Sequence, residues 1–221
     1  MSRRTYGQYC GLAHALELVG ERWALLVIRD LLPGPKRFTD LRNGLPRIPT
    51  NILSARLKEL EASGVIQRRL LPRPQGSVVY ELTDYGRELD DVVLRLSLWG
   101  VRSLGQPRPD DVVTTDSLIM ALRTTFRRDA AAGLHLGYEV RVGDIVVHAL
   151  VDDGKVEVGQ GPLPRPDLVI ITGPELRALL AGELSPGEAV AGGAVRLTGD
   201  PALLDRFVEA FHVPPPPASA A

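Results

Sequence analysis

The sequence predicts an α+β protein of two domains. Its 221 residues exceed the roughly 150 of an average domain. Apolar residues recur at helical spacing through most of the first half, whereas alternation typical of strands is frequent in the second. A stiff polar segment, QPRPDD at 106–111, separates them. We therefore predict one domain over 1–106, a second over 107–213, and a disordered proline-rich tail over 214–221.

Composition excludes several classes of protein. Hydrophobic residues make up 44% and charged residues 24% of the chain, which is ordinary for a globular protein and excludes disorder as the main state. The single cysteine, Cys10, cannot form an internal disulfide framework. No apolar run approaches the roughly 18 residues of a membrane helix, and no signal-peptide core is present, so we expect a cytoplasmic protein without membrane contact.

The two halves differ in charge. Residues 1–106 carry +5, from 16 Lys and Arg against 11 Asp and Glu, and residues 107–221 carry −6, from 10 against 16. Such asymmetry indicates that the first half binds a polyanion and the second half does not.

The pattern of the first half predicts five helices and a hairpin. Apolar spacing predicts two helices between Leu12 and Leu32 with a break at Gly20, a short helix capped by Thr39, and a third pattern from 50 to 62. A hairpin over 65–82 follows, and residues 83–86 then open a long helix from Arg87 to about Leu104. This is winged helix-turn-helix order, although a small helical bundle with solvated arginines would show the same pattern.

The 50–62 helix is amphipathic. Leu53, Leu57 and Leu60 line one face, and the opposite face is small, polar and basic. Small side chains permit close approach to a major groove, where Asn and Ser can bond base edges and Lys meets phosphate. The predicted DNA-contacting residues are Arg37, Thr39, Arg47, Pro49, Thr50, Asn51, Ser54, Ala55, Arg56, Lys58, Arg68, Arg69 and Arg73. Arg56 could equally pair with Glu59 or Asp40.

Five short motifs follow Cys10 in order before Trp99. They are GERW at 20–23, KRFTDL at 36–41, LSARLKELE at 53–61, GVIQR at 64–68 and YELTDYG at 80–86. With them, the segment resembles the HxlR-type winged-helix transcriptional regulators. The resemblance implies a homodimer formed by the first and last helices, with the third helix in DNA and a palindromic operator whose half-sites lie about one helical turn apart.

Cys10 matches the position that some proteins of this type use as a redox or electrophile sensor. A helix start would favour its thiolate, but no second cysteine is available as a resolving partner, and an inert thiol is the alternative. The four histidines show no metal-ligand spacing, and no nucleophile motif occurs. We expect no metal, no cofactor and no enzyme activity.

The second half predicts a mixed domain. A helix capped by Asp116 precedes a meander of three strands over 135–159, and further strands at 167–171 and 194–198 alternate with short helices and a terminal helix. The motifs PDLVI at 166–170, LLAGE at 179–183 and GAVRLTGD at 193–200 resemble the sterol carrier protein type 2 fold. That resemblance implies an apolar tunnel for hydrophobic molecules.

The candidate pocket residues are Leu118, Leu122, Phe126, Leu179 and Phe207, and the alternative is that they fill a solid core. The predicted function is a ligand-responsive repressor that binds double-stranded DNA as a homodimer, with a small hydrophobic effector. The alternative is a carrier of a hydrophobic metabolite whose winged helix serves only dimerisation or docking.

Overall fold

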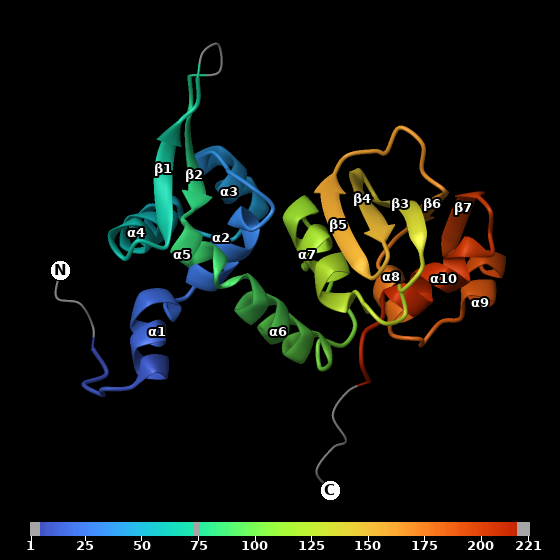
Figure 1. Cartoon of the computed structure of the whole chain (residues 1–221), viewed down its shortest axis with the longest axis horizontal. Coiled ribbons are helices and arrows are strands. Elements are labelled where there is room, and N and C mark those ends of the chain that lie inside the picture. Colours follow the sequence, from blue (N-terminus) through green and yellow to red (C-terminus); the bar gives the residue numbers. More distant parts are fainter. Residues whose placement is uncertain (1–4, 73–75, 216–221) are drawn as a thin grey trace, which may run out of the picture. The chain divides into compact units, whose positions relative to one another are not determined.

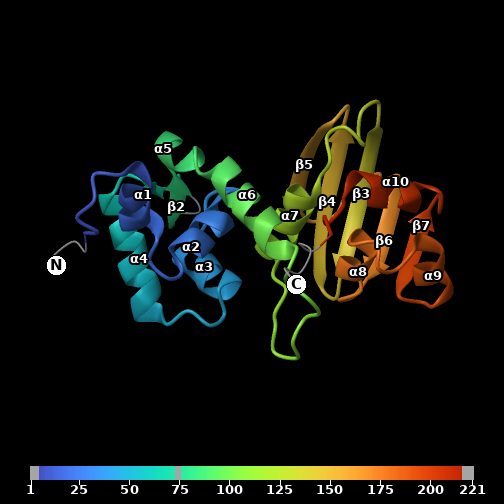
Figure 2. The same cartoon turned by 90° about the horizontal axis from the view of Figure 1, so that it is seen from below.

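The computed structural model describes residues 5–72 and 76–215 (Figures 1 and 2). The chain forms two compact units, residues 1–93 and 94–221. The division falls inside helix α6 (Asp90–Val101), because Val101 packs against the apolar core of the second unit. No helix or strand occurs between residues 104 and 114, the region of the predicted linker.

The first unit begins with the helices that the apolar spacing predicts. They are α1 (Gly11–Val19), α2 (Ala24–Leu31), α3 (Phe38–Gly44) and α4 (Thr50–Ala62). The predicted break at Gly20 is confirmed, since Gly20 caps the C-terminus of α1. The core of this unit is formed by fully buried leucines and β-branched residues, among them Val27 and Ile28 of α2, Leu41 of α3 and Leu53 of α4.

A two-stranded hairpin and two further helical segments complete this unit. Antiparallel strands β1 (Ile66–Leu70) and β2 (Val78–Leu82) form the predicted wing, and α5 (Asp84–Arg87) follows. The predicted long helix from Arg87 to about Leu104 is observed as α6, which begins at Asp90 and ends at Val101. The segment predicted to open it, Thr83–Gly86, instead belongs to the separate helical turn α5 and its N-cap. Thr83 fixes this short turn: its hydroxyl accepts from the backbone of Gly86 and donates to the carbonyl of Gly64.

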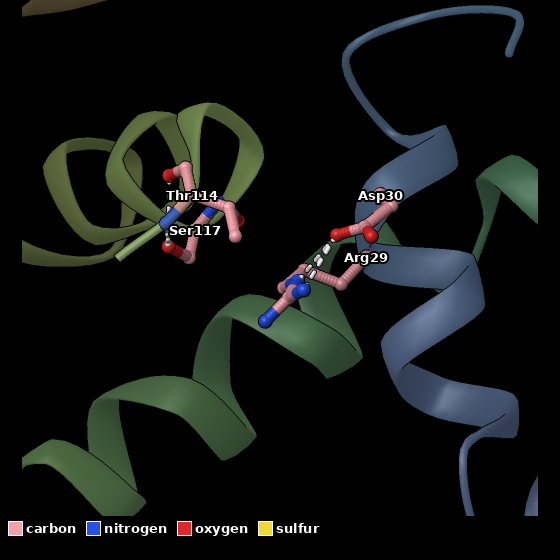
Figure 3. Close-up of polar contacts among 4 residues, drawn as sticks. All are labelled: Arg29, Asp30, Thr114 and Ser117. Carbon is pink, nitrogen blue, oxygen red and sulfur yellow. Dashed lines mark hydrogen bonds and ion pairs between the residues drawn. The ribbon is translucent and has the colours of Figure 1, made fainter. Parts of the chain in front are cut away.

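Two predicted caps also differ. The N-cap of α3 is Arg37 rather than Thr39, and the Arg37 backbone N–H donates to the Asp40 carboxylate at 2.9 Å. The N-cap of α7 (Thr115–Thr125) is Thr114 rather than Asp116, which lies buried in the first turn. Thr114 and Ser117 form a reciprocal capping box, with the Thr114 N–H 2.8 Å from Ser117 Oγ (Figure 3).

Gly86 marks a close approach between α5 and the wing. A Cβ at this position would lie 2.0 Å from the carbonyl oxygen of Val65, a backbone atom that cannot turn away. We expect Gly86→Ala to destabilise the first unit by about 1–3 kcal/mol or more through overpacking. Urea unfolding followed by tryptophan fluorescence measures this. Gly11→Ala is the matched control, because nothing lies within 4 Å of its Cβ position. Equal stability of the two variants would contradict the close approach.

The second unit is a mixed five-stranded sheet with helices. The strand order is β5-β4-β3-β6-β7, and only the β3–β6 pair is parallel. The strands are β3 (His135–Val142), β4 (Ile145–Asp152), β5 (Lys155–Gln160), β6 (Leu168–Thr172) and β7 (Val195–Gly199). The helices after α7 are α8 (Leu176–Leu180), α9 (Pro186–Ala191) and α10 (Leu203–Ala210) (Figure 1).

One face of this sheet forms the core. Tyr138 and Val140 of β3 lie opposite Ala149 and Val147 of β4 and share their face. Apolar residues of α7, α8 and α10 complete the same buried cluster. The predicted mixed arrangement of helices and strands is therefore confirmed for this unit. Most of the predicted tail, residues 216–221, lies outside the described part of the chain.

Candidate nucleic-acid interface

Helix α4 separates an apolar face from a polar one, as its spacing predicts. Leu53, Leu57 and Leu60 are at most 2% exposed. Asn51 and Lys58 are exposed on the other side, with Thr50 at the first turn, and Ser54 and Ala55 between them are half-buried. The Ser54 hydroxyl donates to the Thr50 carbonyl at 3.0 Å, so its oxygen still has capacity to accept. This surface has the small polar chemistry that suits a base edge.

Four more predicted contact residues lie before α4. Arg37 and Thr39 are exposed at the start of α3, and Arg47 and Pro49 are exposed in the loop between α3 and α4. They are therefore accessible on the segments that lead into the helix.

Arg56 is held within the protein. Its guanidinium lies 2.5 Å from the Glu59 carboxylate and 3.5 Å from that of Glu21, and its side chain is 13% exposed. Of the alternatives that the sequence left open, pairing with Glu59 is the one observed, and the second partner is Glu21 on the loop before α2.

The two arginines of β1 project from opposite faces of this wing strand. Arg68 lies opposite Tyr80, on the face turned toward α4, and its Nε donates to Glu61 of α4 at 2.8 Å. Arg69 lies on the other face, where its guanidinium donates to both oxygens of Glu81 at 2.9–3.0 Å. Glu81 is 8% exposed, and the bond from Arg69 lowers its carboxyl pKa. Arg69 therefore neutralises a buried carboxylate.

A groove runs between α4 and the wing. We call it the α4–wing groove; it has a volume of about 180 Å³ and is lined by Phe38, Ser54, Leu57, Lys58, Glu61, Arg68 and Tyr80. It brings together three predicted contact residues, Ser54, Lys58 and Arg68. Arg73, which the sequence predicts near the hairpin tip, lies outside the described residues.

The HxlR-like helix-turn-helix family profile matches residues 18–107. The HTH-type transcriptional regulator YodB of Bacillus subtilis (strain 168) is 39% identical over 85 residues, which are 38% of this chain and 76% of YodB. The uncharacterized HTH-type transcriptional regulator YdeP of the same organism is 35% identical over 91 residues, 41% of this chain and 71% of YdeP. The chain belongs to the HxlR family.

Among solved structures, the redox regulator HypR in its oxidized form is 33% identical, with a TM-score of 0.39, and the match covers 41% of this chain and 94% of HypR. The family profile ends at residue 107, so it covers the winged-helix half of this HxlR protein.

Cys10 of this HxlR protein occupies the N-cap of α1 and is exposed. The backbone N–H groups of Ala13 and Leu12, in the first turn of α1, hold the pKa of the thiol below its ordinary value. A lower pKa increases the thiolate fraction at neutral pH, and the thiolate is the nucleophile.

We expect alkylation of Cys10 by iodoacetamide to reach half its maximal rate at a lower pH in the folded chain than in urea. The fold supplies the two N–H groups, so unfolding removes them and returns the thiol to its ordinary pKa. Rates measured by mass spectrometry across pH 6–10 test this. Coincident pH profiles would contradict stabilisation of the thiolate.

The five candidate pocket residues lie together in the second unit. Leu118, Leu122, Leu179 and Phe207 are at most 3% exposed in one cluster, and Phe126 packs against it. The Phe207 ring lies 4.8 Å from that of Phe211 and 5.1 Å from that of Tyr138, centroid to centroid.

Two kinds of feature are absent from the described residues. They contain no cluster of three or more His, Cys, Asp or Glu side chains that could hold a metal ion. Among them, no helix has the length and apolar character needed to cross a bilayer.

The sequence pattern missed two acidic residues of the interface. Glu61 and Glu81 hold the two wing arginines, but neither pairing follows from helical or strand spacing. The Arg69 pair depends on the hairpin register, which places Gln67 opposite Glu81. The only available signal is the presence of two arginines on the first predicted strand, with Glu81 on the second strand and Glu61 on the preceding helix.

Proposed function

We propose that this HxlR protein is a transcriptional regulator that binds a palindromic DNA operator as a homodimer, with α4 in the major groove and the wing on the backbone. The observation that carries the proposal is the exposed face of α4, where Asn51 and Lys58 lie opposite the buried leucines. Asn can bond adenine edges and Lys can meet phosphate. The net charge of +5 over residues 1–106 favours a polyanionic partner.

Exposed apolar residues support the homodimer. On α1, Leu12 is 70% exposed and Leu16 lies one turn further along; on α6, Val92, Leu96 and Trp99 are exposed at spacings of four and three residues. Such stripes favour burial against a second copy, as in the dimer that the family resemblance implies. Light scattering should then give twice the chain mass of 24.0 kDa.

The second unit is proposed to bind a small hydrophobic effector in a sterol-carrier-like fold and to release the repressor from DNA. The Tyr138 hydroxyl supports a binding role, because it is buried without a hydrogen-bond partner among the described residues and burial raises the pKa of Tyr138 to about 12. Buried polar groups usually have partners, so a ligand acceptor would satisfy this one. The dimer would have two conformations that differ in the spacing of its two α4 helices. The effector binds one conformation more tightly and so shifts the equilibrium toward it.

Fluorescence anisotropy of the purified chain against its own upstream DNA and a scrambled duplex, across a salt series, tests the proposed function. We expect tighter binding to one duplex and a log K that falls steeply with log salt. Failure to bind any duplex, with or without apolar ligands, would contradict it. For the effector, identical DNA-binding curves with every ligand that demonstrably binds would contradict coupling.

A further inference from the structure

The α4–wing groove has the size and charge of a binding site for a small anion. Its volume of about 180 Å³ is roughly six times the ~30 Å³ that a water occupies in the liquid. The groove is therefore large enough for a phosphate group with associated water. Lys58 of α4 and Arg68 of β1 contribute cations to its lining, Ser54 contributes a hydroxyl, and Leu57 is a buried apolar member.

The two cations of the groove differ in their partners. The structure places no carboxylate within ion-pair distance of Lys58 among the described residues. The Arg68 guanidinium, in contrast, is held by Glu61, with Nε 2.8 Å from the carboxylate oxygen. Glu61 also lines the groove, so the carboxylate that pairs with Arg68 belongs to the same site.

The Arg68–Glu61 pair links two different elements and lies at the surface. Its side chains are 57% and 33% exposed. Exposed ion pairs contribute little net stability because water solvates the separated ions well. An incoming phosphate can therefore replace the carboxylate at low cost.

We propose that the α4–wing groove binds one phosphodiester of the DNA backbone between Lys58 and Arg68, and that Glu61 competes with this phosphate for Arg68. The proposal rests on the proposed DNA binding. Arg69, on the opposite face of β1, takes no part, because Glu81 holds it there. Phosphate contacts carry no base information, so Glu61 lowers the affinity for operator and unrelated DNA by the same factor.

Anisotropy with the full chain tests the competition through a double-mutant cycle of Glu61→Gln and Arg68→Ala. We expect Glu61→Gln to tighten binding about two- to fivefold at low salt, on the upstream and the scrambled duplex alike. Arg68→Ala should weaken binding to both duplexes and reduce the salt slope by about 0.9, the value for one phosphate contact. In the Arg68→Ala background, the gain from Glu61→Gln should disappear.

Glu59→Gln is the matched control, because it removes the same charge from the same helix outside the groove and takes a carboxylate from Arg56 instead of Arg68. It measures the effect of losing a paired carboxylate elsewhere on α4. A gain from Glu61→Gln that equals the gain from Glu59→Gln, or that persists without Arg68, overturns the proposal while leaving the proposed function intact. A wild-type chain that binds no duplex at any salt concentration overturns both.

Discussion

Phe207→Ala is expected to destabilise the second unit by about 3–5 kcal/mol, the cost of removing a large aromatic side chain from a close-packed core. Phe207 is fully buried, and its ring contacts those of Tyr138 and Phe211. The lost contacts join the central strand β3 to α10, so the sheet loses the packing that holds this helix against it. Hydrogen exchange of peptides from β3 and α10, read by mass spectrometry, measures the change in this unit alone.

The size of this loss distinguishes a solid core from a ligand pocket. Phe207→Leu is the control, because it keeps most of the apolar volume and should cost less than about 1.5 kcal/mol. If Phe207→Ala also costs less than that, the ring does not pack closely, and the alternative that Phe207 lines an open cavity gains support. A large loss requires any effector site to lie beside this aromatic cluster or to open within it when the ligand binds.

The sequence predicted the elements that depend on local periodicity. The amphipathic pattern of α4 sufficed to place Leu53, Leu57 and Leu60 in the core and Asn51 and Lys58 outside, because helix geometry alone decides those faces. The strands of the second unit followed from alternation and turn residues in the same way.

Features that depend on contacts between distant segments were missed. The apolar spacing continues through Leu89, yet the helix is interrupted there, because Thr83 bonds the Gly64 and Val65 carbonyls and fixes α5 as a separate turn. Thr114 replaces Asp116 as the cap of α7 because its hydroxyl and that of Ser117 satisfy each other's backbone N–H groups.

Charge pairing was predictable only where it is local. Glu59 lies three residues from Arg56 on one helix, so that pair was among the alternatives, whereas Glu21 comes from another element. The adjacent pair Arg29 and Asp30 shows the same limit (Figure 3). Their 2.8 Å bond is local, but the complete burial of Asp30 follows from the packing around α2.

Replacing Asn51 and Lys58 with alanine is expected to separate DNA binding from every other property of the chain. Loss of the Asn51 amide should cost about 1–3 kcal/mol on the operator and relax the preference for one base, if this side chain reads an adenine edge. Loss of Lys58 should weaken binding to operator and scrambled duplexes equally and reduce the salt slope by about 0.9. Both side chains are exposed, so folding should change little.

Salt-dependent anisotropy of both single variants and the double variant measures these effects. Lys155→Ala is the control, because it removes the same charge from an exposed position on β5 in the second unit. A hydrophobic carrier whose winged helix only docks or dimerises would keep its ligand affinity and lose nothing functional in these variants. If the protein is a regulator, the variants should keep their ligand affinity but lose affinity for the operator. Unchanged operator affinity in the double variant would therefore contradict the placement of α4 in the major groove. No other exposed surface of this helix offers both a base-reading amide and a free ammonium.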